Sequence, residues 1–149
     1  MANAQGTALL GQAGPDFALR SFGGTNVRLS EDRGDVVVLT FWGSQCGVCR
    51  KQLDMLDRSL TTYRSAGLHM YGIEVDDDAT HARQFVAAHP LGLVMLEDPG
   101  KEVARLYQID NLPTTVLMDR GGIVRHVYRD FGPRDEALYL SQLRELLNE

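Results

Sequence analysis

The feature that most constrains the fold of this chain is a segment in which an apolar strand, two cysteines and an amphipathic helix follow one another without a break. Residues 36–41 are apolar or β-branched without alternation, which is typical of a central strand covered on both faces. Cys46 and Cys49 come next. Apolar side chains then recur at steps of three and four, namely Leu53, Leu56, Leu60 and Tyr63. The pattern predicts a buried strand, then a helix that starts at Cys46 and stops at Gly67.

The rest of the chain alternates between strand and helix patterns. Apolar runs and turn residues predict a hairpin from 14–19 and 27–29, strands at 68–75, 93–96, 112–118 and 123–129, and helices at 79–89, 101–107 and after 132–133. Asp98 is expected to cap the second of these helices, with Pro99 at its first position. The last helix is expected to bury one apolar face, made of Leu138, Leu143, Leu146 and Leu147.

This order of elements predicts the fold class. Crossovers between parallel strands must lie over the sheet, so the chain is expected to be α/β, with a mixed central sheet flanked by helices and an extra N-terminal β-hairpin. We expect residues 1–13 to be a flexible N-terminal segment and residues 14–149 to form a single domain.

Composition narrows the range of functions. The chain has 149 residues with 20 acidic and 15 basic side chains, a net charge of −5, and no basic stripe that would mark a nucleic-acid surface. No apolar run approaches the roughly 20 residues needed to cross a bilayer. Residues 1–14 lack the basic start and the apolar run of a signal peptide.

The two cysteines favour redox chemistry over metal binding. Cys46 and Cys49 are the only cysteines, so a second pair that would complete a zinc site is missing, and no H-x3–5-H pair exists. Two thiols at this spacing can form a disulfide, and a helix N-terminus favours the thiolate of the first. We therefore predict that Cys46 attacks a substrate disulfide and that Cys49, more buried in the first turn, resolves the mixed disulfide, with Gly47 and Val48 setting the spacing.

Three segments together resemble a known family. The active-site stretch 41–51, the G-P-D-F opening at residues 14–17 and the L-P-T-T-V-L stretch at 112–117 are similar to the TlpA/ResA-like branch of the thioredoxin superfamily, which carries an AhpC/TSA-redoxin-like domain. The resemblance implies a thioredoxin-like fold and a bacterial thiol–disulfide oxidoreductase of the kind that reduces protein disulfides in cytochrome c maturation. It implies protein disulfide substrates, a membrane or soluble thiol as electron donor, and no cofactor.

The resemblance also implies a location. Members are periplasmic or tethered to the membrane facing the periplasm, so a signal or anchor would be absent from this sequence; a cytoplasmic location is the alternative. A shuttle that exposes its cysteines to changing partners is expected to be a monomer.

The family pattern assigns roles around the cysteines. Pro113 falls on the cis-proline loop that faces the cysteine pair, and the backbone of Leu112 is expected to pair with an extended substrate segment. Trp42 is predicted to form a wall of the active-site surface. Gln45 stands where many relatives have an aromatic residue, and it is expected to contact substrate together with Gly47 and Val48.

Two acidic residues are candidates for the acid that tunes the cysteines. Thioredoxins carry a buried acid on the central strand, where this chain has Thr40. ResA-like proteins carry one just after the second strand, and aligning that strand brings Asp77 to the position. Asp77 is therefore the predicted acid, with a solvated helix cap as the alternative interpretation. Glu74 is another acid on the same strand, and by alternation it is expected to face away from the core.

Two other functions compete with this interpretation. A peroxiredoxin-type peroxidase shares the fold and the opening, but its P-x-x-x-T/S-x-x-C arrangement would place proline and a hydroxyl where this chain has Leu39 and Gly43. A thioredoxin-like copper-binding chaperone would use both cysteines and a histidine, for which His126 is the candidate, although such proteins usually have C-x-x-x-C spacing.

Overall fold

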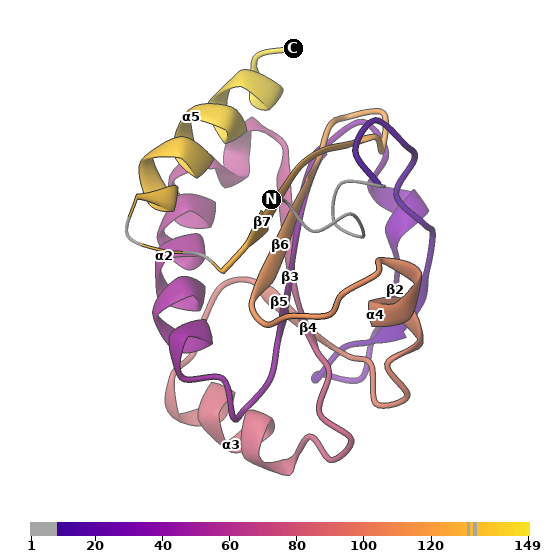
Figure 1. Ribbon diagram of the computed structural model, residues 1–149, viewed down its shortest axis with the longest axis vertical. Helices are drawn as coiled ribbons and strands as arrows, with labels where there is room; N and C mark the ends of the chain where they lie inside the picture. Colours follow the sequence, from indigo (N-terminus) through magenta and orange to yellow (C-terminus); the bar gives the residue numbers. More distant parts are fainter. Residues whose placement is uncertain (1–8, 131, 133) are drawn as a thin grey trace.

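The protein is built around one mixed sheet, seen in a computed structural model that describes residues 9–130, 132 and 134–149. Figure 1 shows the sheet at the centre of the molecule, with strand order β5-β4-β3-β6-β7. The strands are β3 (Val36–Trp42), β4 (Leu68–Glu74), β5 (Val94–Glu97), β6 (Thr114–Met118) and β7 (Val124–Arg129). β3, β4 and β5 are parallel, and β6 is antiparallel to both of its neighbours. The predicted mixed sheet is confirmed.

Helices cover both faces of this sheet (Figure 1). One face carries α2 (Gly47–Tyr63), α3 (Thr80–Ala88) and α5 (Asp135–Leu147). The other carries α4 (Glu102–Leu106), the 3-10 helix η1 (Leu29–Asp32) and the hairpin of β1 (Ala18–Arg20) and β2 (Asn26–Arg28). The predicted hairpin is therefore present, as a separate two-stranded sheet.

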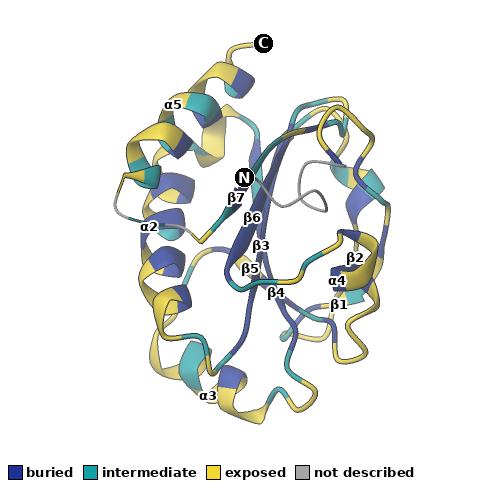
Figure 2. Cartoon of the chain, viewed as in Figure 1, coloured by how far each residue is buried: buried dark blue, intermediate teal, exposed yellow. Residues whose placement is uncertain are grey.

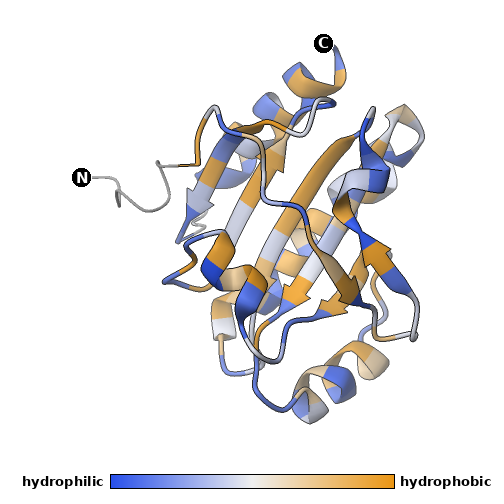
Figure 3. Ribbon diagram, turned by 90° about the vertical axis from the view of Figure 1, so that its right-hand side faces the viewer, coloured by the Kyte–Doolittle hydropathy of each residue, from blue (hydrophilic) through white to orange (hydrophobic). Residues whose placement is uncertain are grey.

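β3 separates two hydrophobic cores. All seven of its residues are buried, as the dark strand in Figure 2 shows, and the central strands form an apolar band in Figure 3. Val36 and Val38 pack beneath α2, whereas Leu39 and Phe41 pack on the opposite side near Tyr107. Each fully buried aliphatic side chain stabilises the fold by about 1.5–3 kcal/mol. The absence of alternation at residues 36–41 thus reflects burial on both faces.

The cysteine helix begins and ends where the pattern predicts. Cys46 is the N-cap of α2, and the helix passes at Tyr63 into a 3-10 turn, Arg64–Ala66. Gly67 follows with a φ of 93°, a left-handed conformation that glycine adopts without strain. The chain then reverses directly into β4.

The buried face of α5 differs from the prediction. Tyr139, Leu143 and Leu146 face the core, whereas Leu138 is 49% exposed. Tyr139 can occupy this buried position because its hydroxyl lies 2.8 Å from the Ser59 hydroxyl. Pro133, which was expected to open the helix, lies outside the described residues.

The short helix α4 also starts differently. The N-cap residue is Lys101 and not Asp98 as predicted, although the Asp98 carboxylate does accept hydrogen bonds from the Val103 and Ala104 N–H groups in the first turn. Pro99, however, does not occupy the first helical position. The Lys101 N–H bonds to the Asp98 carbonyl in an intervening turn, and Lys101 takes a φ of 57°. The helix consequently begins only at Glu102.

Part of the predicted flexible segment is packed on the domain. Residues 1–8 lie outside the described residues, but Leu9 is buried and the Gly11 N–H donates to the Val124 carbonyl at 2.8 Å. Val124 in turn donates to the Gln12 carbonyl at 2.9 Å. The domain therefore includes residues on the N-terminal side of the boundary predicted at residue 14.

Candidate active site

The two cysteines lie where β3 runs into α2, at the lower end of the molecule in Figure 1. They are joined as a disulfide with Cα atoms 5.4 Å apart. Cys46 is half-buried, whereas Cys49 is fully buried in the first turn of α2. An incoming sulfur atom can therefore reach Cys46 and not Cys49, which is the asymmetry expected of an attacking and a resolving thiol.

The local electrostatics favour a thiolate at Cys46. It occupies the N-cap position, and the first turn of α2 contains no acidic residue. The free N–H groups and the dipole at the start of a helix stabilise negative charge. After reduction of the disulfide, the negative charge of the thiolate would therefore lie on the more exposed sulfur atom, that of Cys46.

The proline loop approaches the loop before the cysteines. The Leu112–Pro113 peptide bond is cis, as the resemblance implies. Pro113 is buried and Leu112 half-buried. A Cβ atom placed on Gly43 would stand 3.4 Å from Leu112 Cδ1, so the two loops are in contact. The structure thus brings the Leu112–Pro113 loop against the segment that leads into Cys46.

Of the five predicted substrate-contact residues, three are exposed, Leu112 is half-buried and one is buried. Gln45 and Gly47 are exposed, and the Val48 side chain is an apolar surface group at 58% exposure. Trp42, by contrast, is 1% exposed and packs edge-on against Phe85, with ring centroids 5.9 Å apart. The prediction that Trp42 forms a wall of the active-site surface is therefore wrong, because α3 covers its ring.

Of the two candidate acids, Glu74 is buried and Asp77 is exposed. The Asp77 side chain is 86% exposed and pairs with Lys101 at 3.1 Å, so it is a solvated surface group. Glu74 is 1% exposed and lies opposite Trp42 in the parallel ladder. The expectation that Glu74 faces away from the core is likewise wrong, because β4 is covered on both faces.

The Glu74 carboxyl has a raised pKa. Burial, reinforced by the adjacent Asp76 carboxylate, raises the pKa of the Glu74 carboxyl to about 8. Its Oε2 accepts a hydrogen bond from the Asp76 N–H at 2.8 Å. Neither Glu74 Oε1 nor Trp42 Nε1 has a hydrogen-bond partner among the described residues. The buried Glu74 carboxyl is therefore protonated near neutral pH.

Asp76, which the sequence did not single out, ties this acid to the cysteine loop. Its Oδ2 accepts a hydrogen bond from the Ser44 N–H at 3.1 Å. Burial alone would raise the pKa of Asp76, but hydrogen bonds from Glu74 and Ser44 hold it below its usual range. Within the run of three aspartates, Asp78 bonds to Thr80 at the start of α3. The three aspartates therefore have different contacts: Asp78 bonds at the start of α3, Asp77 forms a surface ion pair and Asp76 holds the cysteine loop. Because all three are the same residue type, the sequence alone could not tell these contacts apart.

Thr40, at the position of the usual thioredoxin acid, belongs to an uncharged network. Its hydroxyl lies 3.0 Å from the Thr115 hydroxyl, which also accepts a hydrogen bond from the Gln52 side-chain amide. All three residues are buried, and Gln52 is one turn beyond Cys49 on α2. The layer next to the cysteine helix is therefore polar without being titratable.

The packing of the cysteine loop gives a first prediction. A Cβ atom on Gly43 would stand 2.9 Å from Asp76 Oδ1, inside the limit of ordinary contact. We expect Gly43→Ala to lower the free energy of unfolding of the oxidised protein by about 1–3 kcal/mol, through overpacking, in urea denaturation. Gly47→Ala is the control, because nothing lies within 4 Å of its added Cβ. Equal stabilities of the two variants would contradict the close packing at Gly43.

The described residues offer no ligand set for the copper-site alternative. His126 lies on the edge strand β7, with its ring 6.4 Å from that of Tyr128. In the part of the chain that the structure describes, no group of three His, Cys, Asp or Glu side chains is placed to hold a metal ion. The peroxidase alternative gains no support either, since Leu39 is buried in β3 and Gly43 has no hydroxyl.

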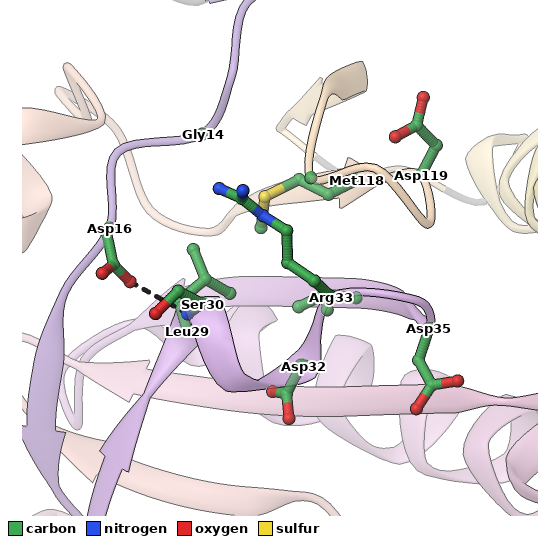
Figure 4. Close-up of a pocket in the computed structure, with 11 residues that line it drawn as sticks. Gly14, Asp16, Leu29, Ser30, Asp32, Arg33, Asp35, Met118 and Asp119 are labelled. Carbon is green, nitrogen blue, oxygen red and sulfur yellow. Dashed lines mark hydrogen bonds between the residues drawn. The ribbon is translucent and has the colours of Figure 1, made fainter.

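A small hollow at the far end of the sheet is not a second site. It lies among Gly14, Leu29, Arg33 and Met118, at the end of β3 remote from the cysteines (Figure 4). Its volume is about 20 Å³, room for about one water molecule.

Comparison with known proteins agrees with this geometry. A family model described as the AhpC/TSA family matches residues 10–127. The chain belongs to the AhpC/TSA family. The thiol-disulfide oxidoreductase ResA of Geobacillus kaustophilus is 29% identical over 118 residues, which cover 79% of this chain and 68% of that protein.

Solved structures extend the agreement to the whole fold. A proposed thiol:disulfide interchange protein DsbE from Chlorobium tepidum is 33% identical with a TM-score of 0.89, covering 93% of this chain and 97% of that one. A proposed protein disulfide isomerase from Bacteroides thetaiotaomicron is 28% identical with a TM-score of 0.86, covering 94% and 91%. These relatives and the Cys46–Cys49 pair confirm the thioredoxin-like fold, the resemblance and the enzyme class, a thiol–disulfide oxidoreductase.

Proposed function

We propose that this AhpC/TSA-family protein is a reductant of protein disulfides of the cytochrome c maturation type. The observation that carries the proposal is the pairing of a half-buried Cys46 at a helix N-terminus with a fully buried Cys49 one turn deeper. The names of its relatives, a thiol-disulfide oxidoreductase and a thiol:disulfide interchange protein, support exchange between thiols and disulfides, and the reducing direction is what the family resemblance implies. Exposure of one sulfur to changing partners favours a monomer.

The proposed reaction proceeds in two exchanges. The Cys46 thiolate attacks one sulfur of a substrate disulfide; a Cys46–substrate disulfide forms and the other substrate sulfur leaves as a thiolate, which takes up a proton. Cys49, once deprotonated, attacks the Cys46 sulfur, so the Cys46–Cys49 disulfide forms and the second substrate thiolate departs. Two electrons pass from the cysteine pair to the substrate. A membrane or soluble thiol donor restores the dithiol by the same chemistry in reverse.

The surface around Cys46 suggests how substrate is held. Val48 supplies exposed apolar area, and Gln45 and Gly47 flank the reactive sulfur. The ladder between β3 and β6 ends at Thr114. The Leu112 backbone therefore lies beyond it, open to an extended substrate segment, with Pro113 holding the loop beside the cysteines.

Glu74 is proposed as the ionisable group that couples to the pair. It lies on the face of β4 that packs toward α2, opposite Trp42, which shares a hydrophobic core with Cys49. Release of a thiol proton from Cys49 into this layer would be assisted by a carboxyl that titrates near neutral pH. Asp77, exposed and paired with Lys101, is not proposed for this role.

The location proposed is periplasmic, or tethered to a membrane and facing the periplasm, in keeping with the family resemblance. Among the described residues, no helix is both long and apolar enough to span a membrane.

The deciding experiment is the reduction potential of the Cys46–Cys49 pair, measured by equilibration with dithiothreitol or glutathione, together with the rate of insulin reduction by the dithiol form. We expect a potential near the thioredoxin value of about −270 mV and turnover of insulin. A potential near that of the strong oxidant DsbA, about −120 mV, would instead show a disulfide donor.

A further inference from the structure

A hollow adjoins the active site on the side of α3. Ser44 and Gln45, which lead into Cys46, form one wall, and Arg50 on α2 forms another. His81 and Phe85 of α3 form the remainder. The hollow is open to solvent and has a volume of about 420 Å³. It is large enough for a side chain next to a cysteine that has bonded to Cys46.

The lining of this hollow is cationic although the chain as a whole has a net charge of −5. Among the described residues that line it, none is Asp or Glu, and Arg50 carries a permanent positive charge; the imidazoles of His81 and His89 lie in the same lining. The nearest carboxylates on α3 and its loop, Asp76 and Asp78, lie outside the lining and both act on His81. Arg50 is therefore the permanently charged residue among the described residues of this lining.

Arg50 is held in place by an aromatic stack. Its guanidinium carbon lies 4.7 Å from the centroid of the Phe85 ring. Phe85 in turn stacks on His89 at 4.9 Å and packs against the buried Trp42. A guanidinium that stacks by its face keeps its N–H edge available for hydrogen bonds. Arg50 makes no ion pair with any residue that the structure describes, so this donor edge is unused.

We propose that this hollow, defined by Ser44, Gln45, Arg50, His81, Phe85 and His89, recognises an acidic side chain next to the disulfide of a protein substrate. The inference rests on the proposed function, because it concerns which disulfides Cys46 attacks. A planar guanidinium accepts a carboxylate through two parallel N–H···O bonds. Arg50 is thus assigned a role in substrate selection and none in the thiol exchange itself.

The other side of the cysteine helix provides a matched comparison. Lys51 follows Arg50 but lines a different hollow, of about 520 Å³, together with Asp54 and Glu136. The mixed charge there gives no reason to select an acidic substrate. Arg50→Gln and Lys51→Gln therefore remove the same charge from adjacent positions that line different hollows.

The test uses three peptides that contain one disulfide and differ only in the residue beside it: Glu, Gln or Lys. For the wild-type dithiol form we expect kcat/KM to be about two- to five-fold higher for the Glu peptide than for the Gln peptide, the range for an exposed ion pair. This ratio should fall toward one as salt screens the charges. Arg50→Gln should abolish the preference and Lys51→Gln should retain it.

The outcomes separate this inference from the proposed function. If all three peptides are reduced equally well by the wild type, or if Lys51→Gln loses the preference as fully as Arg50→Gln, the acidic-recognition site is refuted while reduction itself stands. If no peptide is reduced, the proposed function fails. A change in reduction potential caused by Arg50→Gln acts on all three peptides alike, so it cannot imitate a change in their ratio.

Discussion

Cys46→Ala is expected to lower the rate of insulin reduction to that measured without protein, whereas Cys49→Ala should stop after one step and accumulate a mixed disulfide. The difference follows from geometry: Cys46 is half-buried at the helix N-cap, and Cys49 is fully buried. Without Cys49, the bond between Cys46 and substrate has no internal thiol to resolve it. Non-reducing gel electrophoresis with mass spectrometry would identify the linked species.

The double variant, Cys46→Ala with Cys49→Ala, is the control for adventitious adducts, and added dithiothreitol should release the trapped substrate. A trapped species in Cys46→Ala, or substantial turnover in that variant, would mean that Cys49 can act as the entry thiol. That result would contradict the assignment of roles.

Glu74→Gln is expected to make the free energy of unfolding of the oxidised protein less dependent on pH. The pKa of Glu74 rises from 4.5 to about 8 on folding, so between these values the folded state binds more protons than the unfolded state. The free energy of unfolding must then fall as pH increases, by up to about 1.4 kcal/mol per unit, and the contribution is lost above pH 8. Removal of the titrating group removes this slope.

Urea denaturation at pH 5 to 9 would measure the effect. We expect the variant and the wild type to have similar stabilities near pH 5, because this pH is close to the unfolded-state pKa of 4.5 and keeping Glu74 neutral in the fold still costs little. At pH 9 the variant should be more stable by roughly 2–4 kcal/mol. Asp77→Asn is the matched control: it removes a nearby carboxylate whose side chain is 86% exposed. If both variants show the same pH dependence relative to wild type, Glu74 does not titrate as a buried acid.

The same substitution has a redox readout. If Glu74 exchanges protons with the cysteine pair, the slope of reduction potential against pH between pH 6 and 9 should differ between Glu74→Gln and wild type. Asp77→Asn should leave that slope unchanged. A wild-type slope in Glu74→Gln would limit this carboxyl to its structural role.

The sequence was most informative where one local pattern decides the structure. The run from Val36 to Phe41 and the helical spacing after Cys49 each describe burial of a single element, and both were placed correctly. The face of β4 toward which Glu74 points could not be predicted in this way. Alternation distinguishes a core face from a solvent face, but β4 has no solvent face, so alternation could not place Glu74.

Long-range packing accounts for the other differences. Trp42 ends β3 beside an exposed active-site loop, and only α3, more than thirty residues later, places Phe85 over its ring. Tyr139 replaces Leu138 on the inner face of α5 because a hydroxyl on α2 lies within hydrogen-bond distance of its phenol. In each case the deciding partner lies on another element, beyond the reach of a periodicity argument.

The packing of residues 9–13 has a consequence for orientation. Gly11 and Gln12 bond to Val124, beside the turn that joins β6 to β7, and Met118 at that turn pairs with Val37 at the start of β3. The cysteines follow the opposite end of β3, so the seven-residue strand separates the two places by about 20 Å. The contacts of Gly11 and Gln12 therefore lie at the end of the sheet remote from the cysteines, so this part of the chain takes no space at the sulfur atoms.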